Sequence, residues 1–163
     1  MSKWIKLKYI PLILVIISAI ILLAISILGR TPELKALDEI GANLVRSFSI
    51  AESIDTHGGL LNDGKEFIKY EGFDKSEILR AVSTKGWHSL PIPDTVSCIL
   101  YGGELHARYT DRIPEVKSGY WYFKDRQNNM GDISVIFTRP SANFTVAVYD
   151  SAHNSLYYFR YDS

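Results

Sequence analysis

Apolar and polar positions divide the chain into an apolar amino-terminal segment and a longer mixed segment. From Ile10 to Leu28 the sequence contains no charged residue. A helix of that length, at roughly 1.5 Å per residue, measures about 28 Å, close to the hydrocarbon core of a bilayer. The lysines within residues 1–9 are typical of a cytoplasmic flank. The pattern predicts a transmembrane helix over residues 10–28 and an extracytoplasmic domain over residues 30–163. The protein is therefore predicted to be a single-pass protein of the cell membrane, with its amino terminus in the cytoplasm.

A cleaved signal peptide is the alternative for the same segment. Ala24, Ile25 and Ser26 resemble a small-x-small cleavage site. The apolar run is longer than the roughly 7 to 15 residues of a typical signal core, which favours an uncleaved anchor.

Two helices are predicted after the apolar segment. The first begins with Thr31 as the cap and Pro32 at the first helical position, and a second begins at Asp74 and ends by Gly86. The two prolines within residues 87–93 exclude a central strand and favour an extended, packed loop. The apolar segment that follows is consistent with either a short helix or a strand. Leucine, valine and phenylalanine recur at helical spacing in the first helix, at Leu34, Leu37, Leu44, Val45 and Phe48.

The last part of the chain alternates extended runs with turn-rich segments. Strands are predicted at residues 119–125, 132–139, 143–149 and 155–161. The connections are too short for crossover helices, so the strands form an antiparallel meander. The predicted fold class is α+β: one amino-terminal transmembrane helix, then a small domain with about two helices packed on a carboxyl-terminal four-stranded antiparallel meander.

Alternation along these strands assigns two faces to the sheet. The more apolar face is predicted to be the core, and two interpretations of the other face stay open. Either its rings pack against a second layer, or they form an exposed tyrosine-rich surface suited to recognition. The predicted core positions are Trp121, Phe123, Ile133, Val135, Phe137, Phe144, Val146, Val148, Tyr157, Phe159 and Tyr161, and the candidate binding residues are Tyr120, Tyr122, Tyr149, Tyr158 and Arg160.

Charge and composition remove some classes of partner. The formal net charge of the whole chain is zero, and Lys3, Lys6 and Lys8 precede residue 30, so the remaining part is slightly acidic. Nucleic-acid binding normally needs a basic patch or stripe, so no nucleic-acid partner is predicted. The single cysteine cannot form an intramolecular disulfide, so the domain depends on its core.

No pattern in the sequence indicates a catalytic or metal site. The four histidines are widely separated, and neither His-x-x-x-His nor Cys-x-x-Cys spacing occurs. Cys98 has apolar neighbours, which favour a buried and unreactive thiol. The sequence therefore predicts no catalytic residue, no metal ligand and no cofactor.

The leading functional prediction is a single-pass, membrane-anchored extracytoplasmic binding or regulatory module for a protein or cell-envelope partner. One alternative is a membrane-anchored, hydrolase-like envelope enzyme that uses Cys98 or His106. Another is a structural subunit, because an apolar amino-terminal helix before an antiparallel sheet resembles the pilins. Pilins carry a glutamate early in the apolar segment, and residues 10–28 contain none.

Overall fold

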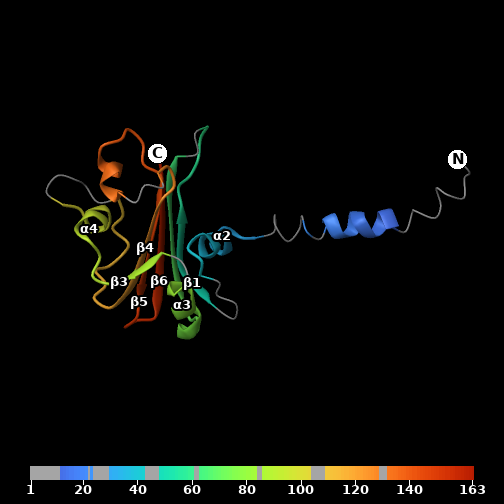
Figure 1. Ribbon diagram of the computed structural model, residues 1–163, viewed down its shortest axis with the longest axis horizontal. Helices are drawn as coiled ribbons and strands as arrows, with labels where there is room; N and C mark the ends of the chain where they lie inside the picture. Colours follow the sequence, from blue (N-terminus) through green and yellow to red (C-terminus); the bar gives the residue numbers. More distant parts are fainter. Residues whose placement is uncertain are drawn as a thin grey trace, which may run out of the picture. The chain divides into compact units, whose positions relative to one another are not determined.

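The chain divides into two compact units, Met1–Lys35 and Ala36–Ser163 (Figure 1). The structure is a computed structural model. It describes residues 12–21, 23, 30–42, 48–60, 63–83, 86–103, 109–128 and 132–163.

The predicted transmembrane helix is wrong. Residues 12–21 and 23 are helical, whereas residues 10, 11, 22 and 24–28 of the predicted span and the flank of residues 1–9 lie outside the described residues. Among the helices that the structure describes, none combines the length and the apolar character needed to cross a bilayer. The single-pass membrane localisation that rested on this helix is therefore wrong as well.

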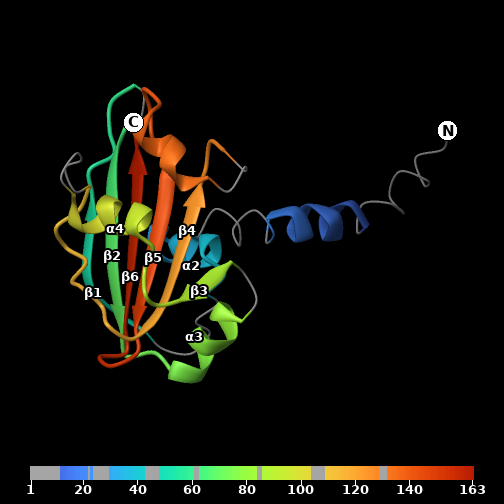
Figure 2. The same cartoon turned by 60° about the vertical axis from the view of Figure 1, so that its left-hand side comes forward.

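A six-stranded antiparallel sheet forms the centre of the second unit, where the sequence predicts four strands. The strand order is β1-β2-β6-β5-β4-β3 (Figure 2). Three of the predicted strands are confirmed as the neighbours β4, β5 and β6. The strands are β1 (Ser49–Asp55), β2 (Gly64–Glu71), β3 (Trp87–Ser89), β4 (Gly119–Asp125), β5 (Phe144–Asp150) and β6 (Ser155–Asp162).

The remaining predicted strand, residues 132–139, is not a strand. It contains the 3-10 helix η1 (Ile133–Phe137). The Asp132 carboxylate caps this helix by accepting from the backbone N–H of Ser134 at 3.0 Å. Within the helix Ile136 is buried, rather than the alternating set Ile133, Val135 and Phe137. A short apolar run cannot distinguish a strand from a helical turn by periodicity, and here the local cap selects the turn.

Three α-helices accompany the sheet: α2 (Pro32–Glu39), α3 (Lys75–Val82) and α4 (Asp94–Tyr101). The first predicted helix is shorter than expected, because Gly41 adopts a φ of 71° and β1 begins at Ser49. A glycine with positive φ just after a helix is a common stop. Predicted residues Leu44 and Val45 lie outside the described residues. The undecided segment before Gly102 is the helix α4.

The cap of α3 confirms the predicted start of the second helix. The Asp74 carboxylate accepts from the backbone N–H of Ser76 at 2.8 Å. We expect Asp74→Ala to lower the free energy of unfolding by about 1 kcal/mol, because the Ser76 N–H in the first turn of the helix loses its acceptor. Urea unfolding measures the loss. Asp74→Asn, which keeps a capping oxygen, should stay within a few tenths of a kcal/mol of the parent; equal losses in both variants would contradict the capping role.

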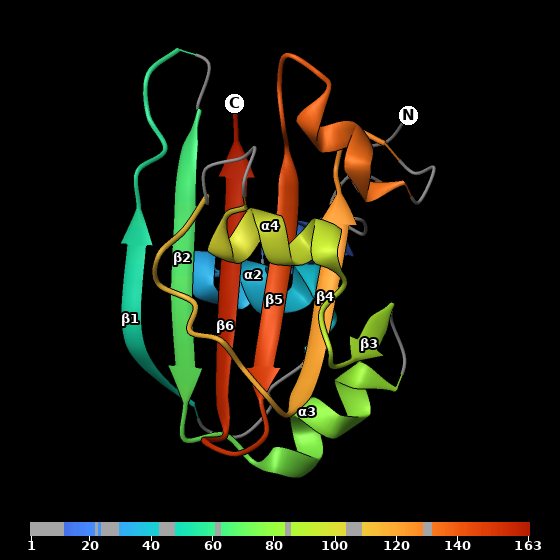
Figure 3. The same cartoon turned by 90° about the vertical axis from the view of Figure 1, so that its left-hand side faces the viewer.

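Helices cover the sheet on both sides (Figure 3). The α2 face bears Tyr122, Tyr149 and Tyr158, and its core includes buried residues of α2 and α3 such as Leu37 and Ile78. The α4 face bears the predicted core set, and residues of α4 and η1 pack there. On this face Trp121, Phe144, Val146, Val148, Tyr157 and Phe159 are buried, which confirms those core predictions, whereas Phe123 and Tyr161 are partly buried.

Candidate binding pocket at the open edge of β4

The predicted exposed tyrosine face is wrong at three of its five residues. Tyr122 is 9 % exposed, Tyr149 is fully buried and Tyr158 is 1 % exposed. Tyr120 and Arg160 are half-buried. The α2 face is covered because α2 and α3 contribute the apolar residues of a second core. The alternative that the sequence left open, rings packed beneath a second layer, is the one that the structure has.

The buried tyrosines also bind polar groups of α2. The Tyr158 hydroxyl donates to Glu39 Oε2 at 2.8 Å, and the Thr145 hydroxyl donates to Glu39 Oε1 at 2.8 Å. Burial, together with the nearby Glu39 carboxylate, raises the pKa of Tyr158 far above its ordinary value, so the phenol stays protonated and donates. These contacts attach the end of α2 to the sheet and leave no exposed tyrosine surface there.

A charged network continues from this point along the carboxyl end of β6. The Arg126 guanidinium contacts Asp162 and donates to the Tyr161 carbonyl at 2.8 Å. Asp162 Oδ2 also lies 3.0 Å from His57 Nε2, and His57 Nδ1 lies 2.6 Å from Asp55 Oδ1. No group of histidine, cysteine and carboxylate residues in the described ranges could hold a metal ion. The network therefore joins the carboxyl ends of β1, β4 and β6.

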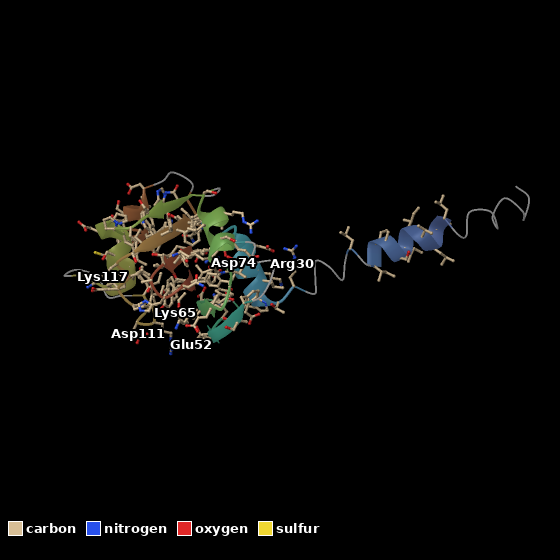
Figure 4. All side chains as sticks on the ribbon, turned by 90° about the horizontal axis from the view of Figure 1, so that it is seen from below. Arg30, Glu52, Lys65, Asp74, Asp111 and Lys117 are labelled. Carbon is tan, nitrogen blue, oxygen red and sulfur yellow. The ribbon has the colours of Figure 1, made fainter. Side chains whose placement is uncertain are left out.

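The rest of the surface carries mixed charge. Lys65, Asp111 and Lys117 are exposed on the second unit (Figure 4). Glu52 forms an ion pair with Arg112. These charges on the described surface are mixed in sign and form no single-sign patch.

β4 is paired over its whole length on one side and over only half on the other. β5 pairs with every residue of β4, whereas β3 pairs only with Tyr120, Trp121 and Tyr122. Leu90 N donates to the Gly119 carbonyl at 3.1 Å, so Gly119 faces β3. Backbone groups alternate sides along an antiparallel strand, so those of Phe123 and Asp125 face the same edge.

Among the described residues, none pairs with that edge beyond β3. Gly86, which precedes β3, has a φ of 61° and does not continue the strand. Within the described part of the chain, no backbone hydrogen bond reaches Phe123 or Asp125 from this side. As far as the described residues show, the backbone groups of Phe123 and Asp125 on this edge are therefore unpaired.

A pocket of about 290 Å³ lies at this open half of β4. This volume is just below the range of about 300 to 1,000 Å³ that is usual for ligand pockets. We call it the β4 pocket, and it is lined by His88, Trp121, Phe123, Lys124, Asp125, Asn128, Asp132 and Ile133.

Aromatic rings form one wall of the β4 pocket. The exposed His88 ring stacks on Trp121 with ring centroids 4.7 Å apart and an interplanar angle of 27°. Trp121 is 8 % exposed, and its buried Nε1 has no acceptor in the part of the chain that the structure describes. A buried donor without an acceptor lowers the stability of a protein by about 1–3 kcal/mol. Such a donor is uncommon in a core that serves only for packing, so this wall differs from an ordinary core.

Two carboxylates line the β4 pocket in different electrostatic states. Asp125 receives two hydrogen bonds from the Arg139 guanidinium, at 2.7 and 2.9 Å. Burial acts to raise the pKa of Asp125, but the bonds from Arg139 and from the Gln127 backbone outweigh it and hold the pKa below its usual range. Bonds from the Ser134 hydroxyl and backbone N–H lower the pKa of Asp132, whose charge has no basic partner among the described residues. Asp132 is the uncompensated charge of the pocket.

Lys124 is the one basic residue with a permanent charge in this lining. It lies between Phe123 and Asp125 on β4 and is exposed. Successive side chains of a strand point to opposite faces, which places the Lys124 side chain on the α2 face. The aromatic wall and Asp125 belong to the α4 face, so Lys124 lies at the rim.

The alternative enzyme prediction, which used Cys98 or His106, stays a prediction. Cys98 is half-buried on α4 rather than fully buried as expected, and no hydrogen bond within those residues joins it to a histidine. His106 lies outside the described residues.

Sequence reasoning missed most residues of the β4 pocket. The sequence predicts Trp121 and Phe123 in the core, His88 in a packed loop and Asp132 in a strand. The available signal was the pair of an aspartate and a serine two residues later, which is typical of a helix cap and not of a strand.

Comparisons with known proteins provide no relative: no family model matches the chain, and neither the curated proteins nor the solved structures contain a match.

Proposed function

We propose that this protein is a protein-binding module whose β4 pocket takes an arginine side chain from a partner. The observation that carries this proposal is the combination in one pocket of aromatic walls and the uncompensated Asp132 carboxylate. A guanidinium stacks on aromatic rings and also pairs with a carboxylate. Arginine is the side chain whose chemistry fits both features.

The size of the pocket supports a single side chain rather than a cofactor. Its volume of about 290 Å³ is at the small end of ligand sites. The Asp125 carboxylate is already paired with the Arg139 guanidinium. Asp132 is therefore the carboxylate that would pair with the guanidinium of a partner arginine. Recognition surfaces of proteins are enriched in aromatic residues around such anchor pockets.

The test uses N-acetyl-arginine methylamide as the probe and the full chain as the receptor. In an NMR titration we expect the signals of His88 and Trp121 to shift with a Kd on the order of 1 mM, typical of one side chain. N-acetyl-citrulline methylamide, which is neutral and nearly the same shape, should bind more weakly. Equal binding by the two compounds, or tighter binding of the acidic probe N-acetyl-glutamate methylamide, would contradict the proposal.

A matched pair of variants separates the pocket from the overall charge. Asp132→Asn keeps the oxygen that caps η1 but removes the charge, so arginine binding should weaken roughly threefold, as for an exposed ion pair. Asp111→Asn removes one charge from an exposed position outside the pocket and should leave binding unchanged. Equal weakening in both variants would indicate a general charge effect instead of a site.

A further inference from the structure

We infer that the partner segment binds as an extended strand that adds to the open half of β4, in line with β3. This inference rests on the proposed function, because the added strand carries the arginine into the β4 pocket. The occupant is a short extended peptide of a partner protein.

A ligand that pairs with the open edge must have both hydrogen-bond donors and hydrogen-bond acceptors. Phe123 and Asp125 each present a backbone N–H and a carbonyl at the edge, because their neighbours Tyr122 and Lys124 face β5. Another peptide backbone in the extended conformation presents the same groups with the same two-residue repeat. Strand addition to an exposed edge is a recurring mode of peptide recognition, in which main-chain bonds supply affinity and side-chain pockets supply specificity.

The chain itself does not supply this strand in the residues that the structure describes. The β3–β4 register pairs Trp87 with Tyr122, so the next residue opposite Phe123 would be Gly86. Gly86 instead has a φ of 61°, outside the range of a strand. Within the described ranges, the edge is therefore unpaired over residues 123–125, which is long enough for a short segment.

The pairing between the added strand and β4 determines which peptide residue can enter the β4 pocket. Residues directly opposite each other on neighbouring strands share a face of the sheet. A peptide residue opposite Phe123 therefore points to the α4 face, where Trp121, Asp125 and the aromatic wall lie. The residues before and after it point to the α2 face and do not enter the β4 pocket.

The experiment compares a blocked heptapeptide with the blocked arginine probe. The peptide has a central arginine flanked by alternating threonine and valine, and binding is measured by NMR titration of the full chain. We expect the peptide to bind at least about tenfold more tightly, because it adds backbone hydrogen bonds. The Phe123 and Asp125 amides should exchange with solvent more slowly when it is bound.

N-methylation of the peptide backbone, one residue at a time, is the decisive control. Methyl groups on the N–H groups that face β4 should weaken binding about tenfold, whereas those on the intervening residues should have little effect. The alternation has a period of two, which a ligand held only by its side chain would not show.

The outcomes separate the inference from the proposed function. If the peptide binds no more tightly than blocked arginine and every N-methyl variant binds alike, strand addition is overturned while the arginine pocket stands. If the arginine peptide and its citrulline counterpart bind alike with the alternating pattern, strand addition stands and the arginine assignment fails. If neither probe binds, or an acidic peptide binds best, both are wrong.

Discussion

Trp121→Ala and Tyr122→Ala are each expected to lower the free energy of unfolding by about 3 to 5 kcal/mol. The two residues are adjacent in β4 and point to opposite faces, yet their exposed fractions are 8 % and 9 %. The Tyr122 ring packs against Trp87 with centroids 5.6 Å apart. Truncation of either ring removes buried apolar surface and leaves a cavity, so neither face tolerates the change.

Urea unfolding of the two variants, side by side, measures the effect. Tyr120→Ala is the matched control, because Tyr120 lies on the same strand and is only half-buried. This variant should lower the free energy of unfolding by about 1 kcal/mol. A Tyr122→Ala variant as stable as the control would mean that the α2 face is open to solvent, and the exposed tyrosine surface would return as a candidate.

Arg126→Met is expected to lower the free energy of unfolding by about 1.5 to 3 kcal/mol, because it removes one of the two guanidinium groups that compensate the largely buried Asp162 carboxylate and leaves only Arg160. The side chains of Arg126 and Asp162 are 17 % and 13 % exposed. Arg126 also donates to the Tyr161 carbonyl, which loses this donor. Arg112→Met, at an ion pair whose side chains are more exposed, should cost less than about 1 kcal/mol.

The same variant should change how stability depends on pH. Burial acts to raise the pKa of Asp162, but hydrogen bonds from Arg126 and Arg160 outweigh it and hold the pKa below its ordinary value. A carboxyl whose pKa is lower in the folded state stabilises the fold above its unfolded pKa of about 4, and this contribution is lost as the pH falls through the folded pKa.

Unfolding measured between about pH 2 and 6 should therefore show a shallower loss of stability on acidification for Arg126→Met than for the parent. Asp162→Asn should flatten the same region. Parallel curves for the parent and both variants would show that this pair does not contribute to acid sensitivity.

Local sequence signals predict the parts of the fold that depend on neighbouring residues. The cap at Asp74 and the alternation in β4, β5 and β6 are such signals, and all are confirmed. Local patterns failed where several conformations share one composition. The apolar runs of residues 10–28 and 132–139 predict a membrane span and a strand, but no helix among the described residues could cross a bilayer, and Ile133–Phe137 form the 3-10 helix η1.

The candidate site was less accessible to sequence reasoning than the fold. The rings of Trp121 and Phe123 were visible as strand residues, but nothing in their order shows that β3 ends after three residues. His88 approaches Trp121 through strand pairing between segments far apart in the chain. A pocket of this kind depends on where a neighbouring strand stops, and that is a property of the assembled sheet.

The sequence by itself determined which side chains of each carboxyl-terminal strand share a face, because the two-residue period is a property of the extended backbone. Only the tertiary structure decided what covers each face. α2 and α3 bury Tyr158 and Tyr149, and β2 joins the sheet beside β6 through backbone pairs such as Ile68 with Tyr158. Pairs this distant in sequence leave no local pattern, because their free energy comes from surface buried only when the whole sheet has formed.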